Sequence, residues 1–192
     1  MDIEHAVDKL NFLYRQSTEN YITLVASMPP FSNFASFTYM VENGKAVYVS
    51  GYAKTVVRMP SLGVKAHPFP TNTEAKAITD RHIANLKDHN IEALISGYAH
   101  DAVILTNLCD HPLEGKEAIR HYCEGLVQNA GAEIDAFTDP AAKITVKEAV
   151  AELSCTAFQH RGKKQCGVLT QRIRDGKIIF ESLTFQNAVP VL

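Results

Sequence analysis

Apolar residues recur at helical spacing in the middle of the chain, and this pattern predicts helices. Ile78, His82 and Leu86 fall on one side of a helix expected over Glu74–His89, with Thr73 as its N-cap. The same spacing predicts three further helices, over Ile3–Tyr14, Ile91–Tyr98 and Glu117–Asn129.

Other segments alternate between apolar and polar residues, which predicts strands. The first three are expected over Tyr21–Met28, Asn33–Val41 and Lys45–Gly51, and Asn43-Gly44 predicts a hairpin turn between the last two. The later ones are expected over Ala102–Asn107, Glu133–Phe137, Lys143–Glu148, Ala151–His160, Gln165–Arg174 and Lys177–Asn187. Helices followed by a run of antiparallel strands favour an α+β fold in which helices cover one face of a curved sheet.

A proline-rich break from Met59 to Pro70 predicts two parts. We expect a helix plus a three-stranded β extension over residues 1–62, a linker over 63–73 and an α+β domain over 74–192. Three strands cannot bury both faces of their sheet alone. The extension should therefore pack on the second domain or on the same segment of another subunit, and we expect a homodimer.

Composition narrows the classes of function. The chain has 192 residues, 46% of them hydrophobic, and a formal charge of −2, so no strong field favours nucleic acid or an anionic membrane. No apolar stretch approaches the ~20 residues that span a bilayer, and the acidic start lacks a signal-peptide core, which favours a cytoplasmic protein. Four widely spaced cysteines are expected as free thiols, and neither metal-ligand spacing nor a cofactor motif is present.

The stretch from Tyr98 to Leu126 has a recognisable layout. A short helix ends at Tyr98-Ala99, a strand follows, and Leu113-Glu114-Gly115 leads into an amphipathic helix; much later, Arg174–Ile178 forms a tight turn. Over about residues 74–187 this layout resembles the nuclear transport factor 2 superfamily, which includes SnoaL-like and ketosteroid-isomerase-like enzymes. The resemblance implies a cone-shaped, cystatin-like α+β domain around one apolar cavity, with an antiparallel sheet.

The chain departs from the superfamily's best-known active sites. His82 takes the position of a tyrosine oxyanion donor in the ketosteroid isomerase branch, and Thr106 takes that of its general-base aspartate. The second acid of that branch falls near Leu169-Thr170, and the strand Gly167–Arg172 also lacks the aspartate of SnoaL-like cyclases. These departures argue against a steroid isomerase or a standard polyketide cyclase.

The first part has a shorter resemblance. Tyr48–Lys54, following the strand-like run Phe34–Val41, looks like the opening strands of flavin-binding split barrels of the haem-utilisation and pyridoxamine-phosphate-oxidase type, over about residues 10–60. Ser50, Lys54 and Arg58 would be the partial match to residues that hold the flavin phosphate.

Two residues carry the candidate chemistry. His82 lies on the apolar stripe and can act as acid or base near neutral pH, or else it is a core histidine satisfied by one hydrogen bond. By period two Glu181 shares a face with Ile179, Leu183 and Phe185, and a carboxylate on such a face must be paired, hydrogen-bonded or protonated. In the other possible register Glu181 faces outward, and the cavity is lined by a hydrogen-bonding row of Ser182, Thr184 and Gln186.

Our leading hypothesis is a cofactor-independent, SnoaL-like protein that binds a small apolar or aromatic molecule and carries out isomerisation, dehydration or cyclisation. His82 and Glu181 would be catalytic, with His82 as the acid–base group and Glu181 either polarising His82 or acting as a second base. The expected ligand contacts are Tyr98, Thr106, Tyr122, Leu169 and Gln171. The alternatives are a non-catalytic association module, or flavin or haem binding through the first part.

Overall fold

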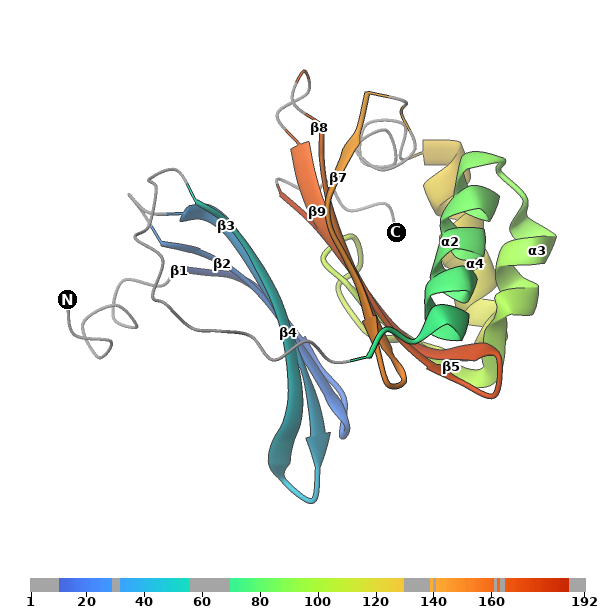
Figure 1. Ribbon diagram of the computed structural model, residues 1–192, viewed down its shortest axis with the longest axis horizontal. Helices are drawn as coiled ribbons and strands as arrows, with labels where there is room; N and C mark the ends of the chain where they lie inside the picture. Colours follow the sequence, from blue (N-terminus) through green and yellow to red (C-terminus); the bar gives the residue numbers. More distant parts are fainter. Residues whose placement is uncertain are drawn as a thin grey trace. The chain divides into compact units, whose positions relative to one another are not determined.

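The computed structural model describes residues 11–28, 32–55, 70–129, 139, 141–160, 162 and 165–186. The chain divides into two compact units, Met1–Phe69 and Pro70–Leu192. Each unit has its own sheet, and each is described separately below (Figure 1).

The larger unit is α+β, as the sequence predicts, and the three helices within its described residues lie on one side of a strongly curved sheet (Figure 1). The helices are α2 (Thr73–Lys87), α3 (Ile91–Gly97) and α4 (Gly115–Asn129). The strands are β5 (Tyr98–Thr106), β6 (Leu113–Glu114), β7 (Lys143–Val150), β8 (Leu153–His160), β9 (Gln165–Arg174) and β10 (Lys177–Phe185). They lie in the order β6-β5-β10-β9-β8-β7.

The sheet is mixed, which corrects the expectation of a purely antiparallel one. β10 pairs antiparallel with β9 but parallel with β5, where Phe180 lies opposite Val103. The reason is that the chain passes through β6, α4 and strands β7 to β9 before β10 returns to β5, whereas an antiparallel pair needs only a hairpin. The remaining neighbours, β5–β6, β7–β8 and β8–β9, are antiparallel.

The core lies between the helices and the concave face of the sheet. The core includes five buried residues from the helices and the start of β5: Ile83, Leu86, Leu94, Tyr98 and Ile119. Large side chains fill this space, and Tyr98, Tyr122 and Phe158 are each about 1% exposed.

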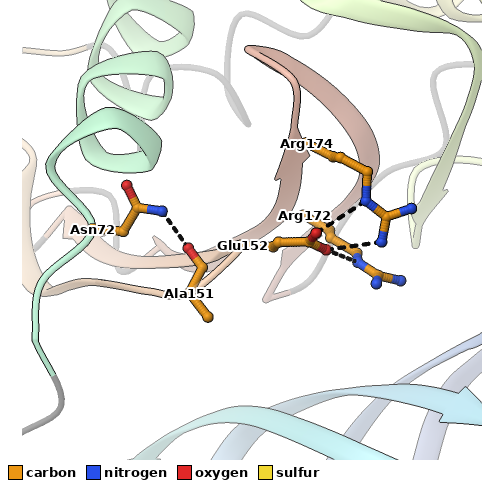
Figure 2. A network of polar contacts seen from close by, with 5 residues as sticks. All are labelled: Asn72, Ala151, Glu152, Arg172 and Arg174. Carbon is orange, nitrogen blue, oxygen red and sulfur yellow. Dashed lines mark hydrogen bonds and ion pairs between the residues drawn. The ribbon is translucent and has the colours of Figure 1, made fainter.

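Polar contacts fix the start of α2 to the far edge of the sheet. The N-cap is Asn72 and not Thr73: its side chain accepts a hydrogen bond from the backbone N–H of Ala75 at 3.0 Å and donates to the carbonyl of Ala151 in the β7–β8 turn (Figure 2). Asparagine is a strong N-cap because its short side-chain carbonyl reaches the free N–H groups of the first turn. Beside it, Glu152 accepts from Arg172 at 2.7 Å and from Arg174 at 2.9 Å (Figure 2).

The smaller unit is a four-stranded antiparallel sheet whose strands follow one another in chain order. Its strands are β1 (Asn11–Ser17), β2 (Tyr21–Met28), β3 (Ser32–Glu42) and β4 (Lys45–Thr55). The predicted turn between β3 and β4 is present, since Asn43 and Gly44 both have positive φ.

β1 shows that the predicted helix over Ile3–Tyr14 is wrong in its last turn. Asn11–Ser17 pairs with β2 as a strand, because an available sheet edge overrides a helical spacing of apolar residues. Residues 1–10 lie outside the described residues, as do the predicted strand Glu133–Phe137, Arg161, Lys163 and most of the proline-rich break.

Candidate functional site

A buried carboxylate on β10 forms the centre of the candidate site. Glu181 is 1% exposed, and one of its oxygens, Oε2, accepts hydrogen bonds from the Tyr98 hydroxyl and the Gln171 amide, both at 2.8 Å. The His82 Nε2 atom lies 3.3 Å from the same oxygen. Two hydrogen bonds and the contact with His82 therefore converge on one carboxylate oxygen.

A β-bulge sets the direction of Glu181. The pairing of β10 with β9 shifts register between Ile178 and Phe180, so one residue of β10, Ile179, is inserted there and interrupts the period-two face that the sequence predicts. The pairing of β10 with β5 is irregular at the same place. Beyond the bulge, Glu181 shares the core face with Leu183 and Phe185, and this answers the question of register that the sequence left open. Its cross-strand neighbour is Gln171, which explains their contact.

Helix α2 brings His82 to this carboxylate. His82 is 4% exposed, and burial lowers the pKa of the imidazole while the Glu181 charge raises it in part. A neutral imidazole beside an ionised carboxylate carries its proton on the nitrogen that faces the acceptor. Nε2 of His82 would therefore donate to Glu181, which leaves Nδ1 to accept a proton.

Tyr98 and Gln171 hold the arrangement in place. The Tyr98 and His82 rings meet edge to face, with centroids 5.6 Å apart. Burial, together with the Glu181 charge, raises the pKa of Tyr98 well above its usual value, so its hydroxyl stays a donor. The carbonyl oxygen of Gln171 accepts from the Thr79 hydroxyl at 2.9 Å, which ties α2 to the sheet a second time.

A recess of about 300 Å³ adjoins the buried cluster. It lies between α2, α3 and the β9–β10 turn, which Figure 1 shows beside the ends of these helices. His82 belongs both to the wall of the recess and to the hydrogen-bonded cluster, so it joins the open space to Glu181.

The predicted site residues divide into two groups. His82, Glu181, Tyr98 and Gln171 come together in the cluster. Thr106, Tyr122 and Leu169 are fully buried, and none of the hydrogen bonds to Glu181 comes from them.

Tyr122 is a special case among them. Its hydroxyl has no partner in hydrogen-bond geometry among the described residues. Burial and the Glu181 charge raise the pKa of Tyr122, and an interaction with Thr106 partly offsets that rise.

Sequence reasoning missed Thr79, Arg81 and Lys177. Thr79 lies three residues before His82 and therefore shares its side of α2, so helical spacing could have revealed it. Arg81 and Lys177 line the recess but are exposed, and surface charges in a sequence give no sign of such a position.

No group of three or more His, Cys, Asp or Glu side chains with the geometry of a metal site occurs among the described residues. None of the helices in the described ranges is long and apolar enough to cross a membrane.

Comparison with known proteins gives structural neighbours only. No family model matches the chain, and no curated protein matches it either. The solved structures that align with it include an NTF2-like protein of unknown function from Mesorhizobium loti, at 16% identity and a TM-score of 0.47, covering 63% of this chain and 98% of that one. Another is a steroid delta-isomerase from Pseudomonas aeruginosa, at 13% identity and a TM-score of 0.45, covering 62% and 83%.

An NTF2-like protein of unknown function from Burkholderia xenovorans aligns at 12% identity with a TM-score of 0.44, over 62% of this chain and 85% of that one. Two of these solved structures are named NTF2-like and one is named a steroid delta-isomerase, and those names describe those proteins. Identities this low concern the fold and not the chemistry. The resemblance of the first part to flavin-binding barrels remains a prediction.

Proposed function

We propose that the larger unit binds a small molecule beside His82 and transfers a proton on it without a cofactor. The observation that supports this best is the contact of His82 with Glu181, because a buried carboxylate that orients a neutral imidazole is a common way to prepare a general base. The recess gives a ligand access to the same histidine.

The chemistry would be an isomerisation through a dienolate. Nδ1 of His82 removes a proton from the carbon between a carbonyl and a C=C double bond; the C–H electron pair stays on the substrate as a dienolate, and the imidazolium returns the proton to the far carbon of the former double bond. Atoms and charge balance without a second reactant. Glu181 would stabilise the imidazolium, and Tyr98 and Gln171 would keep the carboxylate in place.

Carbon-bound hydrogen exchange in D₂O provides the test. The protein is incubated with a panel of small enolisable ketones and keto acids, and deuterium uptake is followed by NMR. We expect uptake with the wild-type protein, and a loss of about 10²-fold or more in His82→Asn, the size typical of a missing acid–base group. His121→Ala is the control, because His121 is exposed on α4. Full exchange by the His82→Asn protein would refute the proposal.

One observation favours a non-catalytic association module as the second candidate. The space between helices and sheet is occupied by large buried side chains such as Tyr98, Tyr122 and Phe158, and this filling leaves little room for a ligand in the centre. In that case the Glu181 cluster would serve only the fold. Absence of exchange across the whole panel, together with a stable oligomer, would support this candidate.

A further inference from the structure

The recess beside His82 combines positive charge with an apolar floor. Arg81 and Lys177 lie on its rim, and its lining includes neither aspartate nor glutamate among the described residues. Ile78, Leu94 and Ile178 contribute buried apolar surface. This pairing of surfaces matches a molecule with an anionic head and an apolar body.

Lys177 and Arg81 differ in the number of hydrogen bonds that their charged groups already make. Lys177 donates through Nζ to the backbone carbonyl of Ser96 at 2.8 Å, at the end of α3. An ammonium has three donors, so the Lys177 head can still bind a ligand. The exposed guanidinium of Arg81 has no hydrogen bond or ion pair with any described residue, which leaves its fork of donors for a carboxylate.

The charge state of the ligand follows from these contacts. One of the two cations already compensates the carbonyl end of α3, where the helix dipole is negative. A singly charged carboxylate is therefore a better match than a phosphate dianion. The amide of Asn85, one helical turn beyond Arg81, adds a neutral donor and acceptor on the same side of α2.

We propose that this recess binds a small organic carboxylate, with the carboxylate between Arg81 and Lys177 and the apolar body on Ile78, Leu94 and Ile178. The inference rests on the proposed function in one respect: the bound carboxylate would be the substrate that His82 deprotonates. Binding itself does not depend on that step.

Titration calorimetry with phenylacetate and phenylacetamide tests the charge requirement. The two compounds have the same shape and differ in charge, and inorganic phosphate serves as a third probe. We expect phenylacetate to bind and the other two to bind at least about tenfold more weakly, as a charge-assisted contact implies. Equal binding of the amide, tighter binding of phosphate, or no binding of phenylacetate would overturn the proposal.

Substitutions locate the binding. Arg81→Gln and Lys177→Gln should each weaken phenylacetate about tenfold, the effect of one charge-assisted hydrogen bond. Lys87→Gln removes a charge from the same helix outside the recess and should have no effect. NMR shifts of the backbone amides of Gly97 and Gly176 should accompany binding. An equal loss in Lys87→Gln would mean that only the overall charge matters, and the recess proposal would fail.

The His82→Asn protein separates this inference from the proposed function. It should keep most of its affinity for phenylacetate while losing deuterium exchange. Binding without any exchange in the wild-type protein would overturn the catalytic role and leave the recess as a carboxylate site. Deuterium exchange by a protein that does not bind phenylacetate would overturn the carboxylate site and leave the catalytic role of His82.

Discussion

At the scale of single residues, the site depends on how many donors one buried oxygen receives. Tyr98→Phe removes a hydroxyl that donates to Glu181 and keeps the ring, so the free energy of unfolding should fall by about 1–3 kcal/mol, as for other buried groups that lose a partner. Tyr122→Phe is the matched control, because its buried hydroxyl lacks a partner in hydrogen-bond geometry. Urea unfolding measures both values, and an equal loss in the two variants would contradict the role given to Tyr98.

His82 should make stability depend on pH below its ordinary pKa of 6.5. Burial lowers the pKa in the folded protein, so as pH falls through 6.5 the unfolded chain takes up a proton that the folded one does not. The free energy of unfolding should therefore decrease below pH 6.5, by up to about 1.4 kcal/mol per pH unit.

The His82→Asn protein should show a flatter profile in this window. The lowered carboxyl pKa of Glu152, held down mainly by its hydrogen bond with Arg174, affects a lower range, below its ordinary 4.5, so the two contributions separate. Urea unfolding at a series of pH values measures both profiles. Parallel profiles for wild type and variant between pH 5 and 7 would contradict the assignment.

The sequence predicted the individual residues better than their contacts. His82 stood out because a titratable group interrupts an apolar stripe, and Glu181 because a carboxylate alternates with apolar residues. A role for Glu181 in polarising His82 was one of two alternatives from the sequence, and the geometry of their contact depends on a one-residue bulge at Ile179 and on the parallel return of β10 to β5. The ligand role expected for Thr106, Tyr122 and Leu169 remains a prediction.

At the scale of elements, Asn72 is expected to contribute twice, as a helix cap and as a tertiary contact. Asn72→Ala should lower the free energy of unfolding by about 1–2 kcal/mol, and Asn72→Asp by less, because aspartate keeps the cap and loses only the bond to Ala151. Asn90→Ala removes a cap with a single partner, Ala93, and provides the reference. Thermal unfolding would contradict this account if Asn90→Ala were as costly as Asn72→Ala.

Strands were predicted more closely than helix ends. β2 and β9 have the predicted bounds, because alternation and flanking turns mark both ends of a strand. The predicted start of α2 was one residue late, since Thr73 and Asn72 are both plausible caps in sequence. β1 was missed because its residues, Asn11–Ser17, alternate poorly and obtain their conformation from pairing with β2.

At the scale of the whole molecule, we predict a homodimer to which the smaller unit contributes. Its sheet exposes Phe12 by 61% and Val49 by 49%, and an apolar hollow of about 290 Å³ lies beside Leu24 and Tyr39. Exposed apolar surface of this kind favours association. Light scattering should give twice the monomer mass, and a Phe12→Ser/Val49→Thr protein should shift toward the monomer.

Circular dichroism of the double variant provides the control, because its spectrum should match that of the wild type. A monomeric wild-type protein at micromolar concentration would refute the dimer. If the double variant is still a dimer, the contribution of this sheet to the contact is refuted, but the dimer itself is not.

The parallel contact between β5 and β10 also has a consequence for the order of events during synthesis. While the ribosome is still making the chain between these strands, Tyr98 and His82 have already emerged, but the carboxylate that they will hold does not yet exist. The edge of β5 that pairs with β10 stays unpaired until β10 is made, and the β5–β10 contact forms slowly because the two strands are far apart in sequence. The pair that we propose for catalysis is therefore assembled by one of the latest steps of folding, and a chain that stalls before β10 has neither a closed sheet nor a site.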